Sequence, residues 1–221
     1  VQAVKTIPSR RQSLTMAGVT DPDRCPGGLR AHSAADGAVV RIRVPGGQTT
    51  GTAIGQLSRI AQRFGSGDLQ LTSRASLQIR GLADPVPDGL IRAVRESGFL
   101  PSQTHERVRN ILASPLTGIS GGRTDVRPLI ASLDSGLNAE PRLASLPSRF
   151  LFALDDGRGD VSGMPFDLGY QAVDHHHGWV LLGGAQRGLF ATARDAVPTL
   201  LELAHRFLAA SQGFDHVWHV P

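Results

Sequence analysis

The sequence predicts an α+β protein made of two units in series, each with its own strands and helices. Segments whose apolar residues recur every two positions alternate with segments where they recur every three or four, as in strands and helices respectively. This order runs once to about residue 115 and begins again after the Gly-Gly pair at 121–122. With 221 residues, 40% of them apolar, the chain can bury a core in each unit.

An irregular segment, residues 1–32, precedes the first unit; it contains prolines and shows no apolar period. Residues 38–47 then predict a strand, because Val40, Ile42 and Val44 alternate with arginines, and a turn follows at Pro-Gly-Gly. Residues 52–65 predict a helix that ends at its final glycine.

The rest of the first unit follows from residues 71–81, which predict one bent strand or two strands. Such a stretch is about twice the usual strand length, so we expect a bend near Arg74. A helix over 88–97 and a closing strand over 108–115 complete the order strand, helix, strand, strand, helix, strand. This is the ferredoxin-like split βαβ order, and it predicts a ferredoxin-like half-domain over residues 33–115.

The second unit is predicted over residues 116–221. Apolar spacing predicts a helix at 124–137, a strand at 149–157 and a helix at 196–211, and residues 169–184 read as strand, turn, strand. This unit is expected to be a second α+β half-domain.

Composition excludes several classes of function. The net charge of +4 is modest and the basic residues form no run of five, so nucleic acid is not an expected partner. No apolar run approaches the roughly 20 residues of a membrane span, and we expect a cytoplasmic protein without membrane contact. The single cysteine, Cys25, cannot form an intrachain disulfide or ligate an iron-sulfur cluster alone, and we expect a buried or loop residue rather than a nucleophile.

Arginine accounts for 22 of the 23 basic residues, since Lys5 is the only lysine. Guanidinium groups bind carboxylates and phosphates through a planar fork. On a strand over 71–81 one face is polar and positive without an acid in the stretch; it comprises Thr72, Arg74, Ser76, Gln78 and Arg80. Arginines also begin two other predicted strands, within HERVRN (105–110) and at Arg149. These side chains either bind an anion or pair with acids such as Asp68, Asp84 and Glu106.

Other motifs favour turn chemistry over catalysis. The triplet His175, His176 and His177 after Asp174 contains metal-ligand types, but adjacent residues point in different directions, which favours a solvated hairpin turn. The run DDGRGD (155–160) reads as a tight turn. His105 and Glu106 face apart on a strand and make a poor acid/base pair. No metal site is predicted.

Three ordered motifs give the chain a family resemblance. The run LTSRASLQIRGL resembles a signature of the sulfite and nitrite reductase superfamily, and HERVRNILASPLTG and LPSRFLFALDDG resemble the two motifs that follow it. Within that superfamily the RCPG start, SRASLQIRGL and RFLFALDDGRGDV are most similar to the precorrin-3B synthases, oxygen-using enzymes of cobalamin biosynthesis. The resemblance covers about residues 24–210.

The resemblance implies a tetrapyrrole site. Arg74 and Arg109 match family arginines on the distal side of the macrocycle, where they hold its carboxylates or the substrate anion, and Arg149 matches the first of two basic residues in the third motif. Gln78, Arg80 and Asn110 match neighbours that help to bind the macrocycle. Several separate guanidinium forks would orient a polycarboxylate such as precorrin-3A.

Two departures from the family pattern determine which activity and how much of the enzyme we expect. Leu151 stands where reductases carry a second basic residue, which argues against a small oxyanion as substrate. The cysteine motifs for the 4Fe-4S cluster belong to a C-terminal half that this sequence lacks. We therefore expect the N-terminal half of a precorrin-3B synthase-like monooxygenase, which hydroxylates the ring and forms a lactone once completed by that half, an electron donor and an iron centre or sirohaem. Without the C-terminal half, this chain is expected to bind the tetrapyrrole but not to catalyse the reaction.

Two alternatives remain open at this point. The chain is otherwise half of a sirohaem-dependent sulfite or nitrite reductase, or a non-catalytic module that binds a tetrapyrrole or another polyanion.

Overall fold

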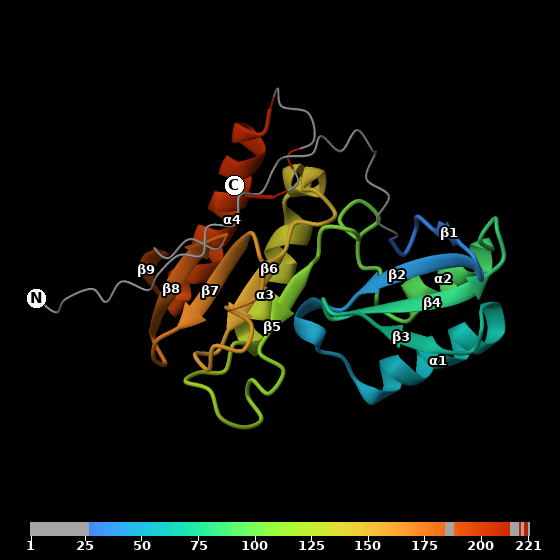
Figure 1. Ribbon diagram of the computed structural model, residues 1–221, viewed down its shortest axis with the longest axis horizontal. Coiled ribbons are helices and arrows are strands. Elements are labelled where there is room, and N and C mark those ends of the chain that lie inside the picture. Colours follow the sequence, from blue (N-terminus) through green and yellow to red (C-terminus); the bar gives the residue numbers. More distant parts are fainter. Residues whose placement is uncertain (1–26, 184–187, 213–216, 218, 221) are drawn as a thin grey trace, which may run out of the picture.

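The computed structural model describes residues 27–183, 188–212, 217 and 219–220. Its strands form two sheets, one of four strands in the order β1-β2-β4-β3 and one of five in the order β5-β6-β7-β8-β9. Figure 1 shows the two units side by side, the first in blue to green and the second in yellow to red. The predicted α+β class, with a ferredoxin-like unit followed by a second unit, is confirmed.

The first unit is an antiparallel sheet with two helices on one face. The strands are β1 (His32–Ala34), β2 (Gly37–Arg43), β3 (Leu69–Leu71) and β4 (Ser76–Leu82), and the helices are α1 (Gly51–Phe64) and α2 (Asp88–Glu96). Val40 and Ile42 of β2 and Leu77 and Ile79 of β4 alternate into a core with Leu57 and Leu90 of the helices. The predicted alternation thus places the arginines of β2 and the polar side chains of β4 on the opposite face.

Local chemistry sets the ends of α1. The Thr50 hydroxyl accepts a hydrogen bond from the Ala53 amide at 3.1 Å, and the Gly65 amide donates to the Ala61 carbonyl as the chain leaves the helix. Before α1, a short 3-10 helix η1 (Pro45–Gly47) carries Gly46 at φ 63°, packed under Ile130 of the second unit. The helix predicted at 52–65 is therefore confirmed within one residue.

The second unit is a mixed sheet with helices on one face. Its parallel strands are β5 (Ile111–Ala113), β6 (Phe152–Asp155) and β7 (Leu168–Ala172), and β8 (His177–Leu182) and β9 (Gly188–Thr192) continue antiparallel. The helices are α3 (Arg127–Ala139) and α4 (Ala193–Ala210), with a short 3-10 helix η2 (Pro141–Ser145) between α3 and β6. Phe152, Leu154 and Tyr170 bury one sheet face against these helices.

One predicted strand lies in the other sheet. Residues 108–115 were expected to close the first sheet, but β5 pairs in parallel with β6, with Ile111 opposite Phe152. The edge strand next to β2 is instead β1, which the sequence pattern did not predict. All three residues of β5 are buried, so either sheet could have accommodated the segment. The predicted domain ranges stay a prediction.

Candidate functional site

The polar face of the first sheet holds Arg41 in place. Arg41 of β2 lies opposite Gln78 of β4 in the antiparallel register. With the Gln78 amide oriented to satisfy its neighbours, its oxygen accepts from Arg41 Nη2 at 2.8 Å and Nε at 3.2 Å, while its nitrogen donates to Gln70. Gln78 therefore orients a guanidinium without neutralising it.

Arg74 lies in the turn that joins β3 to β4, so the bend predicted near it is confirmed. The Thr72 amide donates to the Ser76 carbonyl at 2.9 Å, and the Ser76 amide donates to the Thr72 hydroxyl at 3.2 Å. Ala75 completes the turn at φ 52°, a conformation that residues other than glycine rarely adopt. The tight turn directs Arg74 toward the second unit, where its Nη1 donates to the carbonyl of Arg149 at 3.2 Å.

These segments meet at a hollow of about 310 Å³ between the two units, which we call the arginine cleft. Its lining residues come from β2, the β3–β4 turn, the turn before β6 and the C-terminal segment: Arg41, Thr72, Ser73, Arg74, Arg149 and His219. In the described residues, Arg41 and Arg74 hydrogen-bond to neutral groups, an amide and a carbonyl. The cleft therefore gathers three guanidinium groups, of which those of Arg41 and Arg74 are bonded to neutral groups, an arrangement suited to a carboxylate or phosphate.

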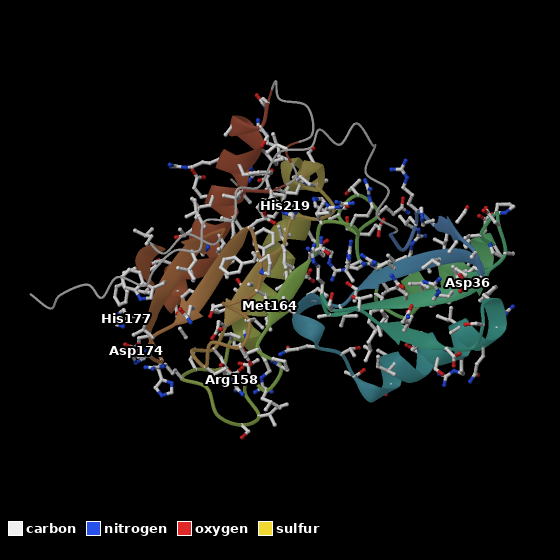
Figure 2. All side chains as sticks on the ribbon, in the orientation of Figure 1. Asp36, Arg158, Met164, Asp174, His177 and His219 are labelled. Atoms are coloured by element: carbon white, nitrogen blue, oxygen red, sulfur yellow. The ribbon has the colours of Figure 1, made fainter. Side chains whose placement is uncertain are left out.

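Arg80, by contrast, is neutralised by an acid. It forms a two-point ion pair with Asp36, with Nε to Oδ2 at 2.9 Å and Nη2 to Oδ1 at 2.8 Å. The bond to Arg80 lowers the pKa of the Asp36 carboxyl. Figure 2 shows Asp36 at the far end of the first unit, well apart from His219. Of the two possibilities that the sequence left open, Arg80 therefore follows the second, with Asp36 as the acid.

Arg109 is buried in a second two-point ion pair. Its Nε and Nη2 donate to the carboxylate of Asp134 on α3 at 2.6 and 2.8 Å, and its Nη1 donates to the Phe99 carbonyl at 3.4 Å. Arg109 lies against a neighbouring hollow of about 350 Å³ and is not among the residues that line the arginine cleft. In this structure it ties the first unit to α3.

Asn110 and Arg43 hold the turn that presents Arg149. The Asn110 side-chain amide donates to the Ser148 carbonyl at 2.7 Å, and Arg43 Nη2 donates to the same oxygen at 3.4 Å. Leu151, just beyond the turn, is 1% exposed and packs with Leu112 and Val161. The second basic position of the reductase pattern is therefore a buried apolar residue here.

The remaining candidates are structural in this molecule. Asp174 caps the β7–β8 turn by accepting from the amides of His176 and His177, which confirms the predicted hairpin turn. In the DDGRGD turn, Asp155 accepts backbone amides, the Gly157 amide at 2.9 Å among them, and Asp156 is paired with Arg158 at 2.7 Å. Cys25 lies outside the described residues.

His105 and Glu106 bond to different partners. The Nε2 of His105 lies 3.0 Å from the Glu140 carbonyl, and its Nδ1 lies 2.9 Å from the Thr104 hydroxyl. The Glu106 carboxylate instead accepts from the Gly28 amide at 2.7 Å. The two side chains therefore do not act as a pair.

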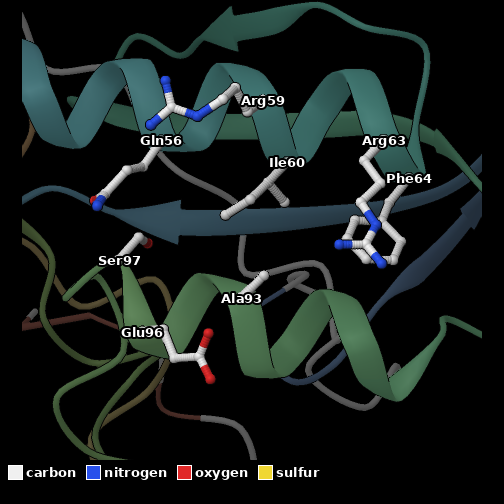
Figure 3. Close-up of a pocket in the computed structure, with 8 residues that line it drawn as sticks. All are labelled: Gln56, Arg59, Ile60, Arg63, Phe64, Ala93, Glu96 and Ser97. Atoms are coloured by element: carbon white, nitrogen blue, oxygen red, sulfur yellow. The ribbon is translucent and has the colours of Figure 1, made fainter.

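A further hollow of about 430 Å³ lies between α1 and α2, on the opposite side of the first sheet. Figure 3 shows its lining, with the Arg63 guanidinium stacked over the Phe64 ring at 5.0 Å from the ring centre. It contains none of the predicted site residues.

Sequence patterns found part of the cleft. They pointed to Arg74 and Arg149 and to Gln78, the support of Arg41, but missed Arg41 as a site residue and missed His219. The alternation of residues 38–44 already placed Arg41 on a polar face, which is a usable signal. His219 has no comparable signal, because only the folded chain brings the C-terminal segment to the cleft.

Comparison with known proteins places this fold in a class. Residues 32–96, which span the first unit from β1 to α2, match the family model described as the nitrite/sulfite reductase ferredoxin-like half domain. The solved structure of the Mycobacterium tuberculosis NirA protein shares the fold, with a TM-score of 0.65 over 90% of this chain and 40% of that one at 17% identity.

Two relatives of known function are similar to this chain. A precorrin-3B synthase from a Sinorhizobium species is 29% identical over 165 residues, which cover 72% of this chain and 35% of that protein. The ferredoxin–nitrite reductase of Synechococcus elongatus is 30% identical over 146 residues, 60% of this chain and 28% of that protein. The resemblance to both groups is confirmed, and the chain matches about a third of the length of these relatives. Among the described residues, no helix has the length and apolar character to cross a bilayer.

Proposed function

We propose that this chain is the N-terminal half of a precorrin-3B synthase-like oxidoreductase and that its arginine cleft binds the peripheral carboxylates of a tetrapyrrole, precorrin-3A in the complete enzyme. The observation that carries the proposal is the gathering of Arg41, Arg74 and Arg149 from separate segments around one cleft. Fixed guanidinium forks bind carboxylates with charge-assisted hydrogen bonds, and separate forks orient a ligand that carries several carboxylates.

The other predicted residues act on the cleft from outside it. Gln78 orients Arg41 and Asn110 holds the turn of Arg149, while Arg109 fixes α3 against the first unit. Their proposed role is to keep the three cleft arginines at set positions. Arg80, paired with Asp36, is the residue least suited to contact a ligand directly.

Leu151 favours the tetrapyrrole over a small oxyanion. A reductase that acts on sulfite or nitrite needs dense positive charge around the reacting group, and this position supplies a buried leucine. The similarity to nitrite reductase nevertheless keeps a reductase half as the second candidate.

The residues of this chain do not fit a 4Fe-4S cluster. Such a cluster takes four thiolates, and the sequence contains one cysteine. In the proposed enzyme the cluster, the oxygen chemistry and the contact with an electron donor therefore belong to a C-terminal half. Reading the gene beyond Pro221 tests this assignment: paired cysteine motifs support the half-enzyme, and a stop codon with no partner gene nearby favours a binding module.

Binding of coproporphyrin III, a tetrapyrrole with four propionates, tests the cleft. We expect Arg74→Ala to weaken binding by about tenfold or more, because it removes charge-assisted hydrogen bonds. A titration followed by absorbance measures the change. Arg206→Ala, which removes an exposed arginine paired with Glu202 on α4, and His176→Ala are the controls. Equal weakening in all three variants would count against the cleft.

A further inference from the structure

His219 lies at the arginine cleft and is held there by a buried acid. Its Nδ1 is 3.1 Å from Oδ1 and 3.2 Å from Oδ2 of Asp167, whose side chain is 2% exposed. A carboxylate accepts hydrogen bonds, so Nδ1 carries the proton and donates to Asp167. The ring therefore keeps Nε2 as its second polar atom, on a side chain that lines the cleft.

Asp167 also positions the strand that follows Arg149. Its Oδ2 accepts from the Leu151 amide at 2.7 Å, and its Oδ1 accepts from the Val220 amide at 2.8 Å. One carboxylate thus fastens both the beginning of β6 and the C-terminal segment. These hydrogen bonds hold His219 at the cleft that Arg149 also lines.

The charges around His219 determine what it can do. Among the residues that the structure describes, its charged neighbours are the carboxylate of Asp167, which bonds to it, and the guanidinium groups of Arg41, Arg74 and Arg149, which line the same cleft. Arginine stays charged throughout the physiological pH range, whereas imidazole changes its charge between about pH 5 and 8.

We propose that His219 is a fourth, titratable anion-binding group of the arginine cleft, held in place by Asp167, and that it makes anion binding stronger at pH 6 than at pH 8. In the protonated ring Nε2–H donates to an oxygen of the anion and adds a positive charge; in the neutral ring this hydrogen bond is lost. The inference rests on the proposed function only in taking the cleft as an anion site.

Two probes test the proposal on the 221-residue chain: sulfate, whose charge is constant in this range, and coproporphyrin III, whose propionates stay ionised above about pH 6. We expect the wild type to bind each about three- to tenfold more tightly at pH 6 than at pH 8, since the imidazolium is half-exposed and its interaction is partly screened. His219→Gln retains a hydrogen-bond donor but does not titrate, so it should bind equally at both pH values, as the wild type does at pH 8. His176→Gln, on the β7–β8 turn, should behave as the wild type.

The outcomes separate the two proposals. A wild-type pH ratio in His219→Gln, or uniform weakening at both pH values, would overturn the role of His219 while leaving the cleft intact. Sulfate binding that depends on His219, without porphyrin binding, would support the titratable site and overturn the tetrapyrrole assignment. Failure of the wild type to bind either probe would overturn both.

Discussion

At the level of single residues, the arginines differ in the charge of their partners. Alternation along β2 and β4 predicts correctly which side chains share the polar face. It cannot predict that Arg80 meets Asp36, 44 positions away, or that Arg109 meets Asp134, 25 positions away. Only the folded chain reveals these two ion pairs, because an acid distant in sequence leaves no periodic signal.

Arg109→Ala is expected to lower the free energy of unfolding by about 2–4 kcal/mol, because it leaves a partly buried carboxylate without its partner. The side chain of Arg109 is 6% exposed and that of Asp134 is 22% exposed. Arg206→Ala, which breaks an ion pair with side chains 74% and 58% exposed, should cost less than about 1 kcal/mol. Urea unfolding followed by circular dichroism measures both. Similar losses in the two variants would show that the Arg109 pair has no special structural role.

At the level of elements, long periodic segments were predicted well and short ones were not. The helices α1 and α4, predicted from their apolar spacing, and the β3–β4 bend are confirmed. The strands β1 and β9 were not predicted, and β5 was assigned to the wrong sheet. A strand of three buried residues such as Ile111–Ala113 has no polar face to indicate its neighbours. Its place is set by the parallel register with β6, a long-range contact.

The 3-10 helix η1 is the element through which the first unit packs against α3. A Cβ added to Gly46 would lie 2.5 Å from Ile130 Cδ1, at a backbone φ of 63°. Gly46→Ala should therefore destabilise the protein by about 2–4 kcal/mol, from backbone strain plus overpacking. Gly159→Ala is the matched control, because that glycine also has a positive φ, 84°, with nothing within 4 Å of an added Cβ. Thermal unfolding of both variants isolates the packing contribution, and equal losses would argue against it.

At the level of the whole molecule, the two units are joined by polar contacts that no sequence pattern predicts. Guanidinium groups of Arg43 and Arg74 reach carbonyl oxygens of the turn before β6, and Arg109 spans from Phe99 to α3. The cleft exists only because this arrangement brings β2, the β3–β4 turn and the C-terminal segment together. Prediction of the two units could therefore succeed while prediction of the complete site could not.

Two carboxyl groups, those of Glu106 and Asp156, have pKa values shifted in opposite directions, and each shift makes the stability of the protein depend on pH. Burial raises the pKa of Glu106, and its bond from the Gly28 amide only partly compensates. The hydrogen bonds from Arg158 lower the pKa of Asp156. A carboxyl group whose pKa is raised by folding contributes stability below its unfolded-state pKa, and this contribution is lost as the pH rises through the folded-state pKa. A carboxyl group whose pKa is lowered by folding contributes stability at neutral pH, and this contribution is lost as the pH falls through the folded-state pKa.

Substitutions at these two positions should therefore change the pH profile in opposite ways. Relative to the wild type, Glu106→Gln should gain stability as the pH rises from about 4 to 7, because the wild type alone must ionise a buried carboxyl group. Asp156→Asn should lose most at pH 7, and its difference from the wild type should shrink in acid, where the wild-type carboxyl is protonated. Urea unfolding at several pH values measures both, with exposed Glu96→Gln as the control. A difference between Glu106→Gln and the wild type that is constant with pH would show that burial does not perturb this carboxyl group.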